Sequence, residues 1–343
     1  MPDAREPMMQ ARIVAPQQTV VERGPVPQPG QGEVLIEVHR AGICGTDLHI
    51  LDGDYALARF PMTPGHEFSG VVAEVGDGVL ERRVGERVTA DPNLPCGRCA
   101  ACGRGEANQC ERLEVVGVTR DGAFARFVVV PEGVVVPIGD LSFAEGALVE
   151  PLACVVWGLE RIRVPVGSAA LVYGLGPMGA LIVQALRAAG VTRVVGVDPS
   201  DTRRAYAQAL GVADVFAPEE AAAGALGAEG FELVVDATGL PAVLEEAFNW
   251  VRPRGTLWVF GVAAGDATVA LRPYDIFKKD LTIVGSFAVN RTVPQAVRML
   301  QDGAVTVDGL VSHVLPLSRF EEGLTLARRD PNRMKVQFDL QAS

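Results

Sequence analysis

The strongest constraint on the fold is a group of three glycines near the middle of the sequence. Gly174, Gly176 and Gly179 form the pattern G-x-G-x-x-G, which follows the apolar run SAALVY and opens the helical segment ALIVQALRAAG. Here the first glycine permits a tight turn, the second lets a pyrophosphate approach the backbone, and the third lets helix and strand pack closely. The pattern predicts a parallel βαβ unit that holds dinucleotide phosphates at a helix N-terminus.

The residues after this motif bear on which dinucleotide is bound. Pro177 and Met178 would supply loop contacts, and Asp198 closes the next strand, VVGVD, nineteen positions after the last glycine of the motif. A carboxylate there accepts hydrogen bonds from the adenosine ribose and repels a 2′-phosphate, so NAD is favoured over NADP. Arg203 and Arg204 follow closely and are able to neutralise a phosphate, which leaves mixed use of NADP open; Arg203 is counted with the cofactor-binding candidates.

The character of the apolar segments changes near Pro151. From residue 34 to about 136, short β-branched runs separated by Gly and Pro are typical of a small antiparallel barrel, and this half is interpreted as all-β: VLIEV, SGVVAEVG, ERVTA and FARFVVV. After Pro151, strand candidates alternate with helical periodicity, as in a parallel sheet: TRVVGVD, FELVVDATG, GTLWVFG and LTIVGSF.

The tail from about residue 292 contains a helical segment, VPQAVRMLQDG, and then a strand that enters another helix, VSHVLPLSRFEEGLTLARR. We expect fold class α/β in two domains. A β-barrel domain covers residues 1–155 and is completed by about 293–343, and a doubly wound parallel sheet of the Rossmann type covers 156–292.

The charge balance and the apolar pattern exclude several classes of function. The 343 residues carry a formal net charge of −11, which repels phosphate backbones and anionic membranes, so no nucleic-acid partner is expected. The most apolar stretch, residues 171–190, is interrupted by glycine, proline, Gln184 and Arg187 and cannot span a bilayer as one helix. The N-terminal MPDAREPMMQ lacks the apolar core of a signal peptide, which favours a cytoplasmic location.

Four of the six cysteines lie close together in the sequence. Cys96, Cys99, Cys102 and Cys110 have the spacing C-x2-C-x2-C-x7-C on a segment rich in Gly and Arg. Four thiolates converging on one tetrahedral cation favour zinc, and a site without an open position favours a structural role. Free surface thiols and an iron–sulfur cluster are the alternatives.

A second group of metal-ligand residues lies on two turn-like segments. Cys44 occurs in GICGTDLHI, and the pair His66 and Glu67 follows a Pro-Gly turn in TPGHEFSG, in a chain with only four histidines. A thiolate, an imidazole and a carboxylate would leave zinc a position for a substrate oxygen, with a further ligand to come from elsewhere. The alternatives are a buried structural Cys44 and a His66 satisfied within the core.

Taken together, CGTDLH, GHEFSG, the four-cysteine segment, EPLA and GLGPMG resemble the zinc-dependent medium-chain dehydrogenase/reductase family, over nearly the whole chain. The resemblance is to its polyol branch, the sorbitol, xylitol and arabinitol dehydrogenases. It implies a GroES-like β-barrel catalytic domain beside a Rossmann domain, one catalytic and one structural zinc ion, and a homotetramer or homodimer. The implied reaction moves a hydride between a polyol or secondary alcohol and NAD and gives the ketone.

The resemblance also assigns roles near the catalytic zinc. It implies that Cys44, His66 and the Glu150 of VEPLAC bind the metal, with Glu67 as an alternate ligand or a close neighbour. Thr46 and His49 match the family's proton relay, through which a substrate proton reaches solvent. The alternative for His49 is a surface residue without a role.

Further contacts to cofactor and substrate follow from the same resemblance. The neighbours of the ribose or nicotinamide would be Thr238, Val262, Ser286 and Phe287. Sorbitol dehydrogenases carry an Arg-Tyr pair where this chain has Ala288 and Val289, so Asn290 or Arg291 is a candidate for substitute polar contacts to the substrate. Tyr55 and Phe60 would either line the substrate pocket or only pack.

Several other functions remain to be distinguished. Within the family, L-threonine dehydrogenase and simple alcohol dehydrogenase are the close alternatives. A nucleotide-binding sensor without turnover is the alternative from another class, because fold alone does not establish activity. A zinc-free quinone reductase would share the βαβ half and lack both metal sites.

Overall fold

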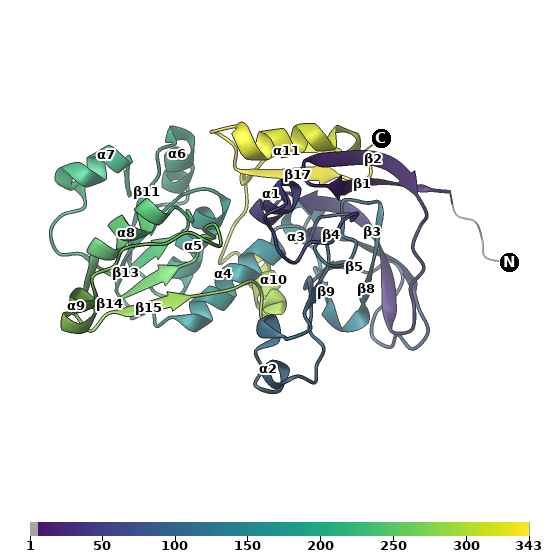
Figure 1. Ribbon diagram of the computed structural model, residues 1–343, viewed down its shortest axis with the longest axis horizontal. Coiled ribbons are helices and arrows are strands. Elements are labelled where there is room, and N and C mark those ends of the chain that lie inside the picture. Colours follow the sequence, from purple (N-terminus) through teal and green to yellow (C-terminus); the bar gives the residue numbers. More distant parts are fainter. Residues whose placement is uncertain (1–5, 343) are drawn as a thin grey trace. The chain divides into compact units, whose positions relative to one another are not determined.

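The structure is a computed structural model that describes residues 6–342 of the 343-residue chain. The chain forms two compact units (Figure 1). Unit 1 contains the chain up to Ala153, then Val289–Gln301, and the residues from Val307 onward. Unit 2 contains Cys154–Ala288 and Asp302–Thr306. Each unit has its own sheet and its own hydrophobic core.

Unit 2 is built on a six-stranded parallel sheet in the order β12-β11-β10-β13-β14-β15. The strands are β10 Ala169–Tyr173, β11 Arg193–Val197, β12 Asp214–Phe216, β13 Phe231–Asp236, β14 Val251–Val259 and β15 Thr282–Gly285. All of these were predicted except β12, a half-buried edge strand too short to give a pattern. The strands β11 and β13 pair with opposite edges of β10, so the strand order reverses between β10 and β13. In such sheets, ligands bind in the crevice at the carboxyl ends of the two strands where the order reverses.

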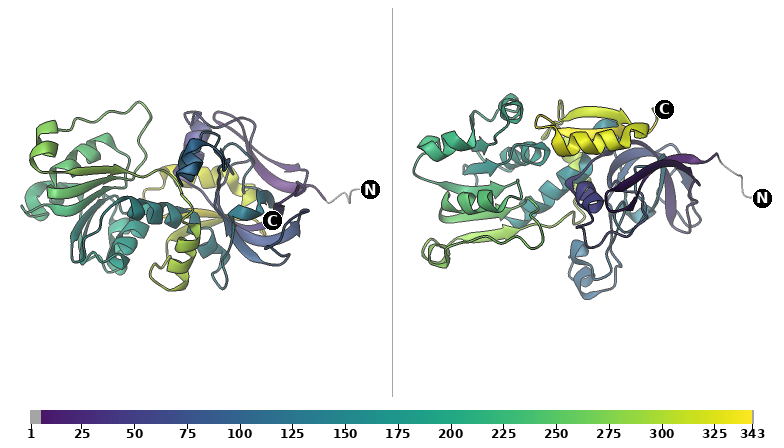
Figure 2. Two further views of the ribbon diagram at one scale, coloured as in Figure 1. Left: turned by 90° about the horizontal axis from the view of Figure 1, so that it is seen from below. Right: turned by 45° about the horizontal axis from the view of Figure 1, so that its top comes forward.

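Helices lie on both faces of the unit 2 sheet, as expected for a doubly wound fold (Figure 2). They are α5 Pro177–Ala188, α6 Asp201–Ala209, α7 Pro218–Glu220 with the π-turn Ala221–Ala225, α8 Pro241–Asn249 and α9 Pro273–Lys278. Proline at the first turn starts α5, α8 and α9, where its missing N–H leaves no hydrogen bond unmade. The most apolar stretch is divided between β10, the glycine turn and α5, and none of the helices in residues 6–342 has the length and apolarity to cross a bilayer.

Unit 1 is built on a seven-stranded mixed sheet in the order β16-β17-β3-β4-β5-β9, with β8 also paired to β3. Its strands are β3 Glu33–Gly42, β4 Glu67–Val75, β5 Arg87–Ala90, β8 Phe127–Pro131, β9 Val135–Pro137, β16 Val311–Pro316 and β17 Lys335–Asp339. The tail therefore returns to this unit, because β17 pairs antiparallel with β3. In the core, the ring centroids of Phe124, Phe320 and Phe338 lie 5.2–5.5 Å apart.

Smaller elements complete unit 1. They are the hairpin of β1 Met8–Ala15 and β2 Gln18–Gly24, the pair β6 Asn93–Leu94 and β7 Glu114–Val115, the single turns η1 Ala107–Gln109, η2 Glu132–Val134 and η4 Leu317–Arg319, and the helices α1 Gly45–Asp52, α2 Ala100–Gly103, α3 Phe143–Gly146, α10 Val293–Gln301 and α11 Phe320–Arg329. The helix α4 Val149–Arg161 starts in unit 1 and continues into unit 2. The helix α11 lies beside the hairpin, where Thr19 Oγ1 donates to Glu321 Oε1 at 2.8 Å (Figure 1).

The prediction that residues 34–136 are all-β missed helix α1. The helix starts because Asp47, at its third position, accepts a hydrogen bond from the Cys44 N–H at 2.8 Å. It ends at Gly53, which has the left-handed φ of 81° that glycine adopts without strain. Eight residues between two capping interactions give too short a periodic pattern to be recognised among strands.

One buried carboxyl group makes the stability of unit 1 depend on pH. Asp91 follows β5, is 9% exposed and accepts a hydrogen bond from the Asn93 N–H at 2.9 Å. Burial raises its pKa from 3.8 to about 6, although this hydrogen bond and Arg291 oppose the shift. Because folding favours the neutral carboxyl group, its contribution is full at low pH and is lost as pH rises toward the folded-state pKa.

We therefore expect Asp91→Asn, which cannot ionise, to gain stability relative to the parent protein as pH rises. The difference in unfolding free energy should increase by about 1.5 kcal/mol between about pH 5 and about pH 8, as urea unfolding would measure. Asp266→Asn, at an exposed position after β14, is the control for loss of one carboxylate. A difference that is constant over this range would contradict the assignment.

Candidate active site and metal centres

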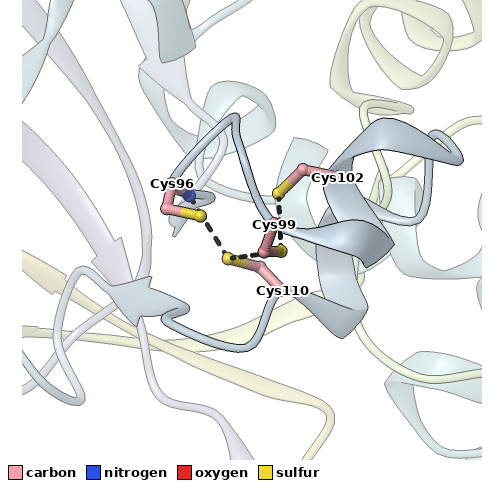
Figure 3. Close-up of side chains that lie close together, drawn as sticks. All are labelled: Cys96, Cys99, Cys102 and Cys110. Atoms are coloured by element: carbon pink, nitrogen blue, oxygen red, sulfur yellow. Dashed lines mark hydrogen bonds between the residues drawn. The ribbon is translucent and has the colours of Figure 1, made fainter.

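The four clustered cysteines converge in the segment that contains α2 and η1. Their sulfur atoms lie within 4.8 Å of one another and point toward a common centre (Figure 3). Cys99 Sγ is 3.4 Å from Cys102 Sγ and 3.9 Å from Cys110 Sγ, and all four are free of disulfide bonds. A tetrahedral zinc site with Zn–S bonds of about 2.3 Å separates its sulfurs by about 3.8 Å, so this set fits a zinc ion closely.

The backbone around this cluster favours thiolates. Hydrogen bonds from N–H groups, above all that of Arg98, lower the pKa of Cys96 to about 6, and the N–H of Cys102 lowers the pKa of Cys99. Burial raises the pKa of Cys102 to about 11. A bound cation would offset that cost, because metal ligation requires the deprotonated thiol.

Cys44, His66 and Glu67 form a second group of potential ligands. Cys44 immediately precedes α1, His66 precedes β4, and Glu67 is the first residue of β4. One potential ligand atom from each of the three lies within 4.8 Å of the other two. Cys44 is half-buried, whereas His66 is 6% and Glu67 1% exposed. Cys44 is thus the most exposed of the three.

Asp47 holds the two ligand-bearing loops together. Its Oδ2 accepts the Cys44 N–H at 2.8 Å, and its Oδ1 accepts the Gly65 N–H at 3.3 Å. The same Oδ1 lies 3.7 Å from His66 Nδ1, so the other ring nitrogen is left for a metal. Sequence reasoning missed Asp47, although its place three residues after a candidate ligand is typical of a helix-capping carboxylate.

Lys335 is the partner of Glu67. Its Nζ lies 2.6 Å from Oε1 and 2.5 Å from Oε2, and the lysine is 5% exposed at the start of β17. Sequence reasoning missed Lys335, although a lysine at the start of a buried strand is a signal for an ion pair.

Negative charge exceeds positive charge around this group. Burial lowers the pKa of His66, but the charges of Cys44, Asp47 and Glu150 raise it well above its ordinary value. Burial also lowers the pKa of Lys335, while Glu67, Cys44 and Glu150 raise it. Glu150, in the first turn of α4 and 7% exposed, is not among the three converging ligands, although its charge acts on both cations. The surroundings therefore fit a bound divalent cation.

The two candidate relay residues lie on α1. Thr46 Oγ1 is 3.7 Å from Cys44 Sγ, and His49 Nδ1 is 3.2 Å from Asp54 Oδ1 with its side chain 40% exposed. The helix thus places the Thr46 hydroxyl beside the Cys44 thiol and exposes the His49 imidazole to solvent. Tyr55 and Phe60 pack against the small cluster of Ile13, Ile50, Met62 and Val118, so packing accounts for both aromatic rings.

In unit 2, the three glycines form the tight turn between β10 and α5. Gly174 has a φ of 89°, and a Cβ on Gly179 would lie 1.8 Å from the Gly174 carbonyl oxygen. Gly176 precedes α5, and a Cβ there would meet nothing closer than Arg203, at 3.7 Å. Pro177 and Met178 form the first turn of α5. The turn therefore has no space for a side chain at Gly179, whereas it has space beside Gly176.

Asp198 fixes this turn from the end of β11. Its Oδ2 accepts the Leu175 N–H and its Oδ1 the Ser200 N–H, both at 2.8 Å, and it is 2% exposed. Arg203 Nη1 lies 3.7 Å from Oδ2, and Arg204 Nη1 donates to the Asp198 carbonyl oxygen at 2.6 Å. The carboxylate thus supports the loop and offsets the charge of Arg203.

The other candidate cofactor contacts follow neighbouring strands of the same sheet. Thr238 follows β13, Val262 follows β14, and Ser286 and Phe287 follow β15. Thr238 Oγ1 donates to Asp236 Oδ1 at 2.6 Å, and Ser286 Oγ accepts the Trp258 Nε1–H at 3.0 Å. Val262 and Phe287 are 75% and 47% exposed. All four therefore share the carboxyl edge of the sheet with the glycine turn.

Comparisons with known proteins decide the family. The model for the alcohol dehydrogenase GroES-like domain matches residues 30–140, and that for zinc-binding dehydrogenases matches residues 177–302. D-Altritol 5-dehydrogenase of Agrobacterium fabrum is 40% identical over 92% of this chain and 94% of its own length. The chain belongs to the zinc-dependent medium-chain dehydrogenase/reductase family.

Other members are similar over comparable lengths. D-Arabinitol dehydrogenase 1 of Uromyces fabae is 36% identical, with 90% of each chain covered, and L-threonine 3-dehydrogenase of Bacillus velezensis is 35% identical, with 89% and 91% covered. A zinc-binding dehydrogenase structure from Sinorhizobium meliloti, bound to NADP, has a TM-score of 0.93 at 31% identity and covers 98% of this chain and 100% of its own. The predicted family, fold class and enzyme class are confirmed.

Membership in this family makes the dehydrogenase a zinc-dependent oxidoreductase that uses a nicotinamide dinucleotide. The structure changes one expectation about its substrate contacts. The side-chain amide of Asn290 hydrogen bonds to the backbone at Gly105 and Ala107, in the four-cysteine segment. Both ends of the Asn290 amide therefore have partners in the four-cysteine segment.

The glycine turn of the dehydrogenase yields a matched pair of substitutions. Gly179→Ala forces a backbone clash and should lower the unfolding free energy of the protein by about 2 kcal/mol and abolish dinucleotide binding. Gly176→Ala should leave stability within about 0.5 kcal/mol, because its Cβ has space and its φ of −63° suits alanine.

The methyl group of Gly176→Ala would nonetheless occupy the approach of the pyrophosphate and should raise the Kd for NADH at least about tenfold. Thermal unfolding and fluorescence titration with NADH separate the two effects. Unchanged NADH affinity in Gly176→Ala would contradict the assignment of this turn.

Proposed function

We propose that the dehydrogenase oxidises a secondary hydroxyl group of a sugar alcohol to the ketone and reduces NAD. The observation that carries the proposal is the convergence of Cys44, His66 and Glu67 in acidic surroundings that include Glu150, in a chain whose relatives include D-altritol and D-arabinitol dehydrogenases. A donor set with a carboxylate at position 150 is what the resemblance to the polyol branch implies. The similarity to L-threonine 3-dehydrogenase makes threonine the second candidate substrate.

In this proposal Cys44, His66 and Glu150 hold the catalytic zinc ion. When bound, zinc supplies Lewis-acid stabilisation of a deprotonated hydroxyl near neutral pH. The contact between Glu67 and Lys335 supports Glu67 as a close neighbour of the metal rather than its resting ligand, because ligation would compete with the lysine. The four-cysteine segment would hold the structural zinc ion.

The proton path follows α1. Thr46 would take part in passing the proton of the substrate hydroxyl away from the metal, and His49 would release it to solvent. The exposure of the His49 side chain supports this direction, since a proton released there passes directly to solvent. Both residues lie on one short helix that starts beside a metal ligand.

The dinucleotide would lie on the carboxyl edge of the unit 2 sheet. Its pyrophosphate would lie at the turn of Gly174, Gly176 and Gly179 and the first residues of α5, and its adenosine ribose beside Asp198. Because Asp198 already offsets the charge of Arg203, a 2′-phosphate would find little free positive charge there, which supports NAD. Contacts to the ribose and nicotinamide would come from Thr238, Val262, Ser286 and Phe287.

We also propose the domain roles that follow. Residues 1–155, completed by about 293–343, form the catalytic domain, and residues 156–292 form the NAD-binding domain, which the division into two compact units supports. A cytoplasmic location is supported by the six free cysteines, four of them grouped as for a metal ion.

The test of the proposed function is the formation of NADH with a panel of alcohols: D-altritol, D-arabinitol, sorbitol, xylitol, L-threonine, butanediol and ethanol, with NADP in parallel. We expect turnover of a sugar alcohol with NAD that a chelator abolishes, and a loss of kcat of about a hundredfold or more in Glu150→Gln. Glu160→Gln, at an exposed position of the same helix, is the matched control. Turnover of threonine or ethanol alone, or no turnover at all, would overturn the proposal.

We further propose that the dehydrogenase forms a homodimer or homotetramer. In unit 2, β15 is an edge strand, and Ile283 on it is 40% exposed. Tyr274 and Phe277 on α9 are 66% and 80% exposed. An uncovered edge strand beside exposed apolar side chains is typical of a surface that pairs with a second copy.

Ile283→Lys should therefore lower the molar mass in solution, to that of one chain from a dimer or to that of two chains from a tetramer, as light scattering with size-exclusion chromatography would measure. Leu80→Lys, which changes a leucine that is 86% exposed in unit 1, should leave the mass unchanged. A parent protein that elutes as a single chain would contradict this proposal.

A further inference from the structure

The chain returns from unit 2 to unit 1 between Ala288 and Val289. Two residues of this crossing have left-handed backbone conformations, Ala288 with a φ of 51° and Arg291 with a φ of 62°. Residues other than glycine adopt this conformation rarely, and neighbouring contacts must hold them in it. The crossing directly follows Phe287 and Ser286, at the end of β15.

Those contacts come from the four-cysteine lobe, defined as residues 96–110. Asn290 Oδ1 accepts the Ala107 N–H at 3.0 Å, and Asn290 Nδ2 donates to the Gly105 carbonyl oxygen at 3.2 Å. Gly105 and Ala107 lie between the third and fourth cysteines of the cluster. The amide group of Asn290 thus docks on the loop that the four sulfurs close.

The strand that leads into the lobe holds the crossing from its other side. Asn93, 5% exposed and three residues before Cys96, donates from Nδ2 to the Val289 carbonyl oxygen at 2.7 Å. Asp91 accepts a hydrogen bond from the backbone of Arg291. A cavity of about 390 Å³ borders these residues, and Val289 is 1% exposed, so polar contacts and burial of one apolar side chain together hold this part of the crossing.

The lobe has little apolar material of its own. Its buried cluster consists of Cys99, Ala101, Cys102 and Cys110, with Cys96 and Leu113 packed against it. Since sulfur atoms dominate this cluster, order in the lobe depends on what binds the sulfurs. Loss of order in the lobe would therefore remove the hydrogen-bond partners of Asn290.

We propose that Asn290 is a positioning residue through which the metal-bound lobe fixes the crossing at residues 288–291. Loss of the lobe metal then releases the crossing, and with it the backbone that follows Ser286 and Phe287. An accompanying loss of dinucleotide affinity is expected only if the proposed cofactor site is correct. The expected loss of order in the crossing does not depend on that site. By thermodynamic linkage, an interaction that orders the crossing also raises the affinity of the lobe for its metal.

The test is hydrogen exchange of the zinc-loaded protein, followed by mass spectrometry of peptides that cover residues 288–293. Asn290→Ala should speed exchange there at least about tenfold while the zinc content stays unchanged. Asn290→Asp keeps the acceptor for the Ala107 N–H and should be intermediate. Arg104→Ala, which breaks an exposed ion pair with Glu106 on the same lobe, is the matched control and should leave exchange at the parent rate.

A second arm tests the metal itself. In a Cys44→Ser background, where the lobe holds the remaining zinc ion, chelation should raise exchange of residues 288–293 to the level of Asn290→Ala and add nothing when both substitutions are combined. Parent-like exchange in Asn290→Ala, or an equal effect of chelation with and without Asn290, would overturn the proposal. Because neither readout requires turnover, failure here is distinguishable from failure of the proposed function.

Discussion

The ion pair of Lys335 and Glu67 is the interaction on which the rest of unit 1 depends. Each partner is almost fully buried, and a lone buried charge of either sign costs several kcal/mol. The pair joins the first residue of β4 to the first residue of β17 and so ties the metal-ligand loop to a strand on the far side of β3. With Glu67 offset by Lys335, the remaining acidic groups around His66 are available to balance a metal.

The two candidate metal centres would use the same ion in opposite ways. In the lobe, four sulfurs from one short segment would enclose the cation, so binding and local folding would be a single event. In the catalytic group, ligands from separate loops depend on a surrounding shell, in which Asp47 fixes both loops through backbone N–H groups. Three protein ligands would leave the metal one position for a substrate, which is what a catalytic site requires. Rigidity comes from the metal in one case and from the sheet in the other.

Motifs whose parts lie close together could be predicted from the sequence. The glycine turn and the four-cysteine segment were found because spacing alone encodes their geometry. Lys335, in contrast, is 268 residues from Glu67, and Asn290 is 183 residues from Ala107, so no local pattern connects either pair. Asp47 was missed for a different reason. It lies inside a recognised motif, but its second partner, Gly65, becomes its neighbour only after folding.

The position of β17 in the chain has a consequence for how the molecule is made. All six strands of unit 2 are complete by Gly285, about 50 residues before Lys335 is added. Until β17 pairs with β3, one side of that strand lacks its partner and Glu67 lacks its counter-charge. Because domains fold as units during synthesis, a nascent chain would form its dinucleotide fold first and its catalytic metal site last.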